Sequence, residues 1–130
     1  MSYLLDTSAV IALLRRHPRL EARLRQERPA DVAISSIVAH ELCYGACRAK
    51  RQRENLAIVD ALAFPVLDFD AVDARRAGEV RAALAAEGTP IGPYDVLIAG
   101  QALSRGVVLV THNTGEFERV AGLRLEDWEA

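Results

Sequence analysis

The stretch VVLVT, residues 107–111, is apolar at four consecutive positions before it ends in a threonine. Such a run without polar alternation is typical of a β-strand that is covered on both faces, as in a parallel sheet. Gly106 precedes it and ends the segment VLIAGQALS, which we predict to be an apolar helix. A helix that leads directly into a doubly covered strand favours an α/β fold.

The rest of the chain repeats this alternation of strands and helices. Further strands are expected at SYLLD (2–6), VAIS (32–35), FPVLDF (64–69) and LRLE (123–126). Helices are expected from Thr7-Ser8 to Pro18, over about 19–28, from Ser36 towards Arg48, up to about Ala63, and from Asp70 to Gly88. Without a linker or repeat, this pattern predicts one α/β domain over residues 1–130 with a mostly parallel sheet.

Composition limits the classes of protein that this sequence fits. The chain has 130 residues, of which 51% are hydrophobic and 5% aromatic, so it can build one largely aliphatic core. No apolar run approaches the roughly 18 residues that span a bilayer, and Asp6 interrupts the first apolar stretch, which argues against a secretory signal. We expect a cytoplasmic protein without membrane contact, with Cys43 and Cys47 reduced and buried.

The basic residues are unevenly distributed. A net charge of −2 does not by itself indicate a nucleic-acid-binding protein, but arginines crowd residues 15–28, and a second cluster contains Arg48, Lys50, Arg51 and Arg53. Because arginine binds phosphate bidentately, Arg48, Arg51 and Arg53 are candidate RNA-binding residues. Two solvated helix faces are the alternative, and the clusters alone favour that alternative.

Four acidic residues each fall at or just after a stretch that resembles the end of a β-strand. They are Asp6, Glu41, Asp95 and Glu116. In a parallel α/β sheet the carboxyl ends of the strands gather along one edge, where the ligand crevice opens. Carboxylates collected there would repel one another unless cations or protons compensated them. Two Mg²⁺ or Mn²⁺ ions would do so, and such a site suits phosphodiester hydrolysis.

Each acid also has a purely structural interpretation. Asp6 and Asp95 are well placed to stabilise helix N-termini, and Glu116 fits an exposed surface position. Glu41 lies in the apolar segment IVAHELCYGA, where a buried ion pair with arginine is the alternative to a cation. We prefer a common site because these interpretations would have to coincide four times. The sequence has no GxGxxG or GxxxxGK[ST] motif and no evident Ser-His-Asp set, which excludes those classes.

Four segments together resemble the PIN-domain ribonucleases and, more narrowly, the VapC-type toxins of bacterial toxin–antitoxin pairs. They are LLDTSAVIALL (4–14), SSIVAHELCYGA (35–46), GTPIGPYDVLIAGQAL (88–103) and LVTHNTGEFERVAGLRLEDW (109–128). The resemblance implies a three-layer PIN-like domain with a mostly parallel sheet of four to five strands. It also implies a homodimer and a cognate VapB-type antitoxin that covers the acids.

The resemblance assigns roles to individual residues. It places catalytic and metal-binding acids at Asp6, Glu41, Asp95 and Glu116. Many relatives carry aspartate at the last of these positions, and Gly115 replaces a larger, often basic residue. Thr7 and Thr111 are expected to orient carboxylates, and Asn113 to hold a metal-bound water or substrate, with a purely structural role in the turns at strand ends as an equal alternative. In the implied mechanism a metal-activated water attacks the RNA phosphodiester in line and leaves 5′-phosphate and 3′-hydroxyl ends.

The expected function is therefore that of a Mg²⁺- or Mn²⁺-dependent endoribonuclease that acts as a toxin. Two alternatives remain: a PIN-domain RNA-processing nuclease without an antitoxin, and a catalytically weak module whose acids hold a partner's arginine. An antitoxin gene directly upstream would argue against the first alternative, and metal binding without RNA cleavage would favour the second. Val10, Leu13 and Leu14 are candidate apolar contacts for a partner.

Overall fold

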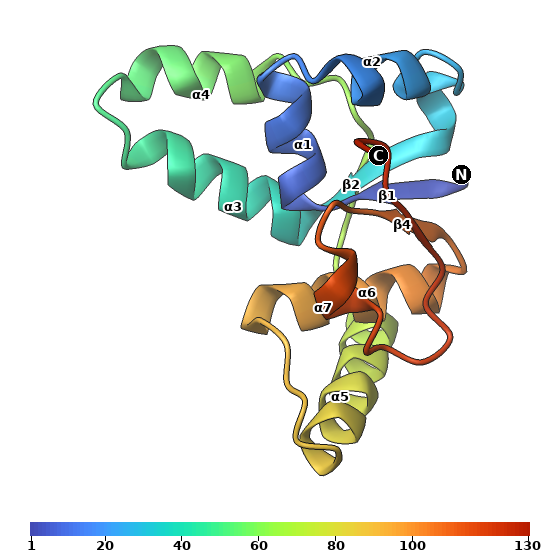
Figure 1. Cartoon of the computed structure of the whole chain (residues 1–130). Helices are drawn as coiled ribbons and strands as arrows, with labels where there is room; N and C mark the ends of the chain where they lie inside the picture. The colour runs from blue at the N-terminus through green and yellow to red at the C-terminus, as the bar shows by residue number, and fades with distance from the viewer.

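A five-stranded parallel sheet forms the centre of the computed structural model, which describes all 130 residues (Figure 1). The strands are β1 (Tyr3–Leu5), β2 (Val32–Ser35), β3 (Val66–Leu67), β4 (Val108–Val110) and β5 (Leu125–Glu126). Their order across the sheet is β3-β2-β1-β4-β5, and every neighbouring pair is parallel. The predicted α/β class is confirmed, and the sheet is parallel throughout.

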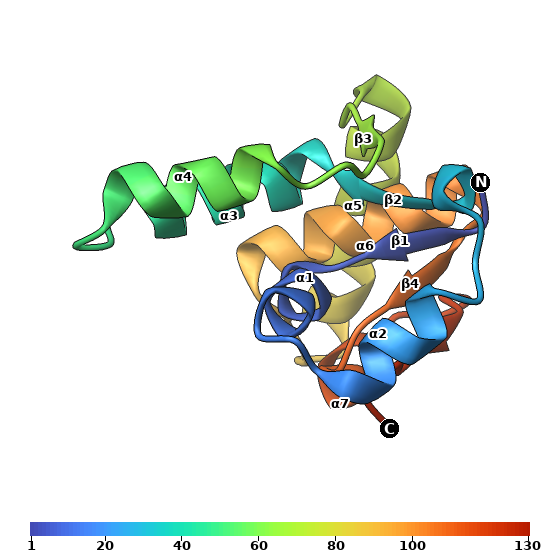
Figure 2. The ribbon, with the colours of Figure 1, turned by 90° about the horizontal axis from the view of Figure 1, so that it is seen from above.

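Seven α-helices flank the sheet in two layers. They are α1 (Thr7–Leu14), α2 (Pro18–Leu24), α3 (Ser36–Cys47), α4 (Gln52–Asp60), α5 (Ala71–Ala86), α6 (Pro93–Arg105) and α7 (Thr114–Phe117). In Figure 1, α1, α2 and α4 lie above the sheet, whereas α5, α6 and α7 lie below it. Helices α3 and α4 pack on each other and project from the body as an arm, which Figure 2 shows from above.

The core lies around the central strand β1. Leu4 and Leu5 are fully buried, and β1 pairs with β2 on one side and with β4 on the other. Most of the buried side chains are aliphatic, and Phe117 and Trp128 are the buried aromatic residues. This agrees with the low aromatic content, and it makes the end of β1 the point at which the sheet and both helical layers meet.

Two local features fix the direction of α6. A Cβ atom at Gly100 would lie 2.5 Å from the Cα atom of Ala77, so only glycine allows α5 and α6 to approach this closely. Gly106 ends α6 in the left-handed conformation, with φ of 65°, as predicted. The first turn of α6 is thereby held at the carboxyl edge of the sheet.

Three expectations are corrected. The helix predicted over 19–28 ends at Leu24, and a short 3₁₀ turn at Pro29–Asp31 follows it. The strand predicted over 64–69 is limited to Val66–Leu67. Cys43 and Cys47 are exposed rather than buried, because α3, which carries them, belongs to the projecting arm. No helix combines the length and the hydrophobicity needed to cross a lipid bilayer.

Candidate active site at the carboxyl edge of the sheet

Asp6 directly follows β1 and is buried. One carboxylate oxygen, Oδ1, accepts hydrogen bonds from the Ala9 amide at 2.8 Å and from the Ser8 hydroxyl at 2.7 Å. The other oxygen, Oδ2, accepts a 2.5 Å hydrogen bond from the Thr111 hydroxyl at the end of β4. Burial raises the pKa of Asp6 despite these bonds. Asp6 therefore does cap α1, as its structural interpretation requires, and it also joins β1 to β4.

Glu41 lies in the second turn of α3 and is partly exposed. The Thr7 hydroxyl donates a 2.8 Å hydrogen bond to its Oε1 atom. No basic group lies within 4.0 Å of the Glu41 carboxylate, so the alternative of a buried ion pair with arginine is wrong. Because Asp6 and Thr7 are consecutive, the end of β1 contacts both β4 and α3.

Asp95 lies in the first turn of α6, at the start of which Gly92 is the N-cap. It follows a loop between two helices rather than a strand, which corrects the expectation that all four acids stand at strand ends. Burial, and then the negative charges of Glu116, Asp6 and Glu41, raise the pKa of Asp95 to about 7. A Cβ atom at Gly92 would lie 3.2 Å from Oδ2 of Asp95 and 3.6 Å from Oε1 of Glu116, so these two carboxylates face the same backbone position.

Glu116 lies on the short helix α7, and both of its carboxylate oxygens have partners. Oε1 accepts a 2.6 Å hydrogen bond from the Gly92 amide, and Oε2 accepts one of 2.6 Å from the Asn113 side chain. The Gly92 bond is the main reason that the pKa of Glu116 is lowered. Gly92 is a functional residue that was not predicted, although a glycine three positions before Asp95 was a usable signal.

The chemistry of these donors suits a hard divalent cation. All four side chains offer carboxylate oxygens, and none of the four forms an ion pair with a basic residue. Buried or crowded carboxylates without a basic partner require protons or a metal ion to compensate their charge. The metal-binding role of Asp6, Glu41, Asp95 and Glu116 stays a prediction, and the structure supplies an oxygen-rich environment for it.

A second cluster of polar residues near Asp6 was not predicted. Nδ1 of His112 lies 3.0 Å from Oδ2 of Asp127 and 4.0 Å from Oε2 of Glu129. The hydrogen bond to Asp127 raises the pKa of His112, and the charge of Glu129 contributes to the raised pKa of Asp6. Asp127 and Glu129 follow His112 by 15 and 17 residues in the sequence, so no local pattern could have revealed the cluster.

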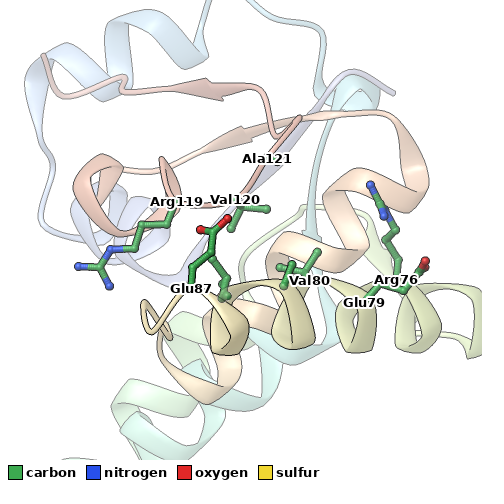
Figure 3. Close-up of a pocket in the computed structure, with 9 residues that line it drawn as sticks. Arg76, Glu79, Val80, Glu87, Arg119, Val120 and Ala121 are labelled. Carbon is green, nitrogen blue, oxygen red and sulfur yellow. The ribbon is translucent and has the colours of Figure 1, made fainter.

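The remaining basic candidate residues, and one small pocket, are not part of this acidic edge. Arg48, Arg51 and Arg53 are exposed at the tip of the arm, where the chain turns from α3 into α4 (Figure 2). Figure 3 shows a small pocket of about 130 Å³ between α5 and residues 119–121, which is lined by both basic and acidic side chains. None of the four acids lines this pocket.

Comparison with known proteins places the chain in a family. The family model described as "PIN domain" matches residues 3–123. A protein from Shigella flexneri named tRNA(fMet)-specific endonuclease VapC is 42% identical over 130 residues, which cover 98% of each chain. Ribonuclease VapC2 of Haemophilus influenzae is 37% identical over 131 residues, again with 98% of each chain covered.

Solved structures give the same result in three dimensions. The chain superposes on the crystal structure of DNA-bound VapBC from Salmonella typhimurium with a TM-score of 0.93 and 41% identity, covering 98% of each chain. For VapBC-1 from nontypeable Haemophilus influenzae the TM-score is 0.91 and the identity 32%, over the full length of both chains. The chain therefore belongs to the PIN-domain family, among its VapC-type ribonucleases.

Proposed function

We propose that this chain is a divalent-metal-dependent endoribonuclease that acts in the cytoplasm as the toxin of a toxin–antitoxin pair, with residues 1–130 forming one nuclease domain. The observation that carries the proposal is the set of four carboxylates at one edge of the sheet without a basic partner. The pKa of Asp95, raised to about 7 by burial and by its three acidic neighbours, supports a site that needs positive charge for compensation.

The residues of the site divide the work between them. Asp6, Glu41 and Asp95 offer the oxygens that would hold Mg²⁺ or Mn²⁺, and Thr7 and Thr111 fix two of these carboxylates by hydrogen bonds. When bound, such an ion lowers the pKa of a water molecule and neutralises charge on the phosphodiester. The carboxylates keep this position anionic, so that RNA alone is repelled and a cation must accompany it.

The main role of Glu116 in this proposal is to hold other parts of the site in place. Its oxygens are held by the Gly92 amide and by Asn113, and it links the loop before α6 to the segment after β4. It thereby fixes the loop from which Asp95 starts and adds a fourth negative charge to the metal-binding edge. Asn113 donates its side-chain amide to Glu116, and its role in holding water or substrate stays a prediction.

The names of the relatives support an RNA substrate and make a transfer RNA the first substrate to test. The Shigella flexneri relative is named as a tRNA(fMet)-specific endonuclease, and other relatives are named as ribonucleases. The test is cleavage of total RNA and of initiator transfer RNA by the purified protein with Mg²⁺ or Mn²⁺. EDTA and the Asp95→Asn variant are the controls. Metal-dependent fragments that both controls lack are expected, and cleavage that persists in EDTA would overturn the metal dependence.

An antitoxin partner is supported by the VapBC assemblies that the chain resembles and by a groove beside Glu41. This groove, of about 410 Å³, lies between α1 and the arm and is lined largely by apolar side chains, among them Ile11, Leu14 and Ile58. Leu14 was an expected partner contact, whereas Val10 belongs to the core and is wrong as a contact residue. Leu13 lines a different pocket, next to α2.

Two experiments test the assembly. Co-expression with the product of the gene directly upstream should abolish RNA cleavage and yield a stable complex, and substitution of Ile58 by aspartate should weaken that complex. Light scattering of the free chain should give the mass of a homodimer. Cleavage that the product of the upstream gene does not inhibit would return the protein to the class of RNA-processing PIN nucleases.

A further inference from the structure

The exposed face of α3 carries a row of side chains that the proposed site does not use. His40, Tyr44 and Arg48 follow one another at four-residue intervals, so they lie one above the other on the same side of the helix. All three are exposed, and Tyr44 is 60% accessible. Glu41 lies next to His40 in the same helix, so the row runs outward from the acidic edge.

The inner end of the row reaches the other side of the site. The ring of His40 lies 5.1 Å from the ring of Tyr94, centroid to centroid. Tyr94 immediately precedes Asp95 and is 46% exposed. Because α3 packs against α6, and His40 and Tyr94 are the chain neighbours of Glu41 and Asp95, the two rings form one surface at this side of the site.

The outer end of the row is basic. The guanidinium carbon of Arg48 lies 5.6 Å from the centroid of the Tyr44 ring, and the chain then turns through Lys50, Arg51 and Arg53 at the tip of the arm (Figure 2). None of these four basic side chains forms an ion pair. Elsewhere, Arg23, Arg28 and several other arginines do have carboxylate partners.

The exposure of these rings is unusual within this molecule. Phe117 and Trp128 are buried, and the ring of Tyr3 packs against Trp128. The other two tyrosines of the chain, Tyr44 and Tyr94, stand in solvent on this one surface. Exposed aromatic rings beside unpaired cations are the combination on which proteins stack the bases of single-stranded nucleic acid while holding its phosphates.

We propose that the row formed by Tyr94, His40, Tyr44 and Arg48 is a binding track for single-stranded RNA that leads from the catalytic edge to the tip of the arm. Bases next to the cleaved bond stack on the Tyr94–His40 pair and on Tyr44, and phosphates further along contact Arg48, Arg51 and Arg53. This inference rests on the proposed ribonuclease function and makes the substrate a single-stranded segment, such as a loop, rather than a duplex.

The length of the track sets a requirement on the substrate. Seven residues of helix separate Glu41 from Arg48, which corresponds to about 10 Å along the axis. A dinucleotide that occupies the acids cannot also reach the arm. Substitutions in the outer part of the track should therefore raise KM for an extended single strand and leave kcat for a dinucleotide unchanged.

The first test measures binding of a fluorescent, unstructured oligoribonucleotide by anisotropy in the Asp95→Asn background, so that the RNA stays intact. Tyr44→Ala should weaken binding about tenfold, because one base loses its stacking partner, whereas Tyr44→Phe should bind like its parent. Arg81→Ala, which changes an exposed arginine on α5, is the control for charge. A duplex of the same sequence should bind more weakly and should not respond to Tyr44→Ala. Equal binding by the Ala and Phe variants would overturn the track.

A second test locates the stacked base. Removal of a single base from the oligoribonucleotide, position by position, should weaken binding at the nucleotide that stacks on Tyr44, and Tyr44→Ala should cancel the effect at that nucleotide alone. Purely additive effects at every position would contradict the proposal. In parallel, Arg48→Gln with Arg51→Gln should reduce the slope of log K against log salt by about 1.4, and an unchanged slope would remove the arm from the track.

The outcomes separate this inference from the proposed function. If the protein cleaves RNA and Tyr44→Ala behaves like Tyr44→Phe, the nuclease stands and the track is wrong. If wild type never cleaves RNA but the abasic experiment singles out one nucleotide, the track stands and the nuclease function fails. If Tyr44→Ala changes the oligomeric mass instead of RNA binding, the face is a contact between copies of the chain, and the track is overturned.

Discussion

Two aspartates occupy the same position in consecutive helices and differ in almost every other respect. Asp73 is the third residue of α5, and Asp95 is the third residue of α6. Burial would raise the pKa of Asp73, but hydrogen bonds from Arg105 and Ser104 lower it to about 2. Burial and three acidic neighbours raise the pKa of Asp95 to about 7. A place in the first helical turn thus does not decide the state of a carboxyl group; its neighbours decide it.

The difference marks two kinds of site. Asp73 completes a capping box with Asp70 and lies 3.0 Å from a guanidinium nitrogen of Arg105, so its charge is compensated within the fold and joins α5 to α6. Asp95 has no basic partner in the protein, so its charge must be compensated by a proton or a bound cation. Unpaired acids of this kind destabilise the fold and are typical of functional sites.

The largest expected effect comes from breaking the compensated site. Arg105→Met leaves the Asp73 charge buried without its cation, which should lower the free energy of unfolding by about 3–5 kcal/mol. Urea denaturation measures the loss, and Arg81→Met, at an exposed arginine without an ion pair, should change it by no more than about 0.5 kcal/mol. Similar stabilities for the two variants would show that Arg105 does not compensate Asp73.

Substitution of the uncompensated Asp95 should have the opposite effect: activity falls, whereas the stability of the metal-free protein does not. Asp95→Asn should reduce RNA cleavage more than about a hundredfold, beyond the usual effect of residues that only orient metal ligands. In EDTA its free energy of unfolding should equal or exceed that of wild type, because like-charge repulsion is relieved. Asp73→Asn is the matched control at the same helical position, where stability should fall and cleavage by the folded fraction should persist.

The pH dependence of stability should separate the two aspartates in metal-free protein. For Asp73 the folded pKa is below the unfolded value of 3.8, so its contribution of about 2 kcal/mol is present above pH 4 and is lost as pH falls towards 2. For Asp95 the folded pKa is raised to about 7, so stability is highest below pH 4 and is lost as pH rises through 7. Denaturation of Asp95→Asn should lack the second decline, and a decline identical to wild type would contradict the assignment.

A smaller effect is expected from removal of the Thr7 hydroxyl, which donates a hydrogen bond to Glu41. Thr7→Val removes the 2.8 Å hydrogen bond to Glu41 and keeps the shape of the side chain. Apparent metal affinity and cleavage should fall about tenfold, as is usual for groups that orient a ligand. Thr7→Ser restores the hydroxyl and should restore both. If Thr7→Val cleaved RNA with unchanged metal affinity, Thr7 would be a structural residue only.

The parts of the fold that depend on local pattern could be predicted from the sequence. The apolar runs at β2 and β4, the capping box of Asp70 and Asp73, and the stop at Gly106 each depend on a few neighbouring residues. The length of β3 and the end of α2 could not be predicted, because tertiary contacts rather than local preference set them. The exposure of Cys43 was missed because a helix that projects from the body leaves one face uncovered.

The candidate site shows the same division. The four acids could be chosen as candidates from their residue types and their surroundings in the sequence. Their hydrogen-bond partners could not be predicted. The Thr7–Glu41 bond spans 34 residues and the Gly92–Glu116 bond spans 24, and no periodicity connects such pairs. Asp95 was wrongly placed after a strand, since the packing of α6 on α5, and not a strand, brings it to the acidic edge.

The position of β1 between β2 and β4 has a consequence for the synthesis of the protein. Tyr3 pairs with Val32 on one side, but its second partner is Val108, which the ribosome adds much later. A nascent chain that stops before Val108 already carries Asp6, Glu41 and Asp95, yet it lacks both β4 and the Thr111 hydroxyl that holds Asp6. Incomplete chains should therefore be harmless. A nuclease with this topology becomes active only when nearly all of it has been made, which protects the RNA of the ribosome that is translating it.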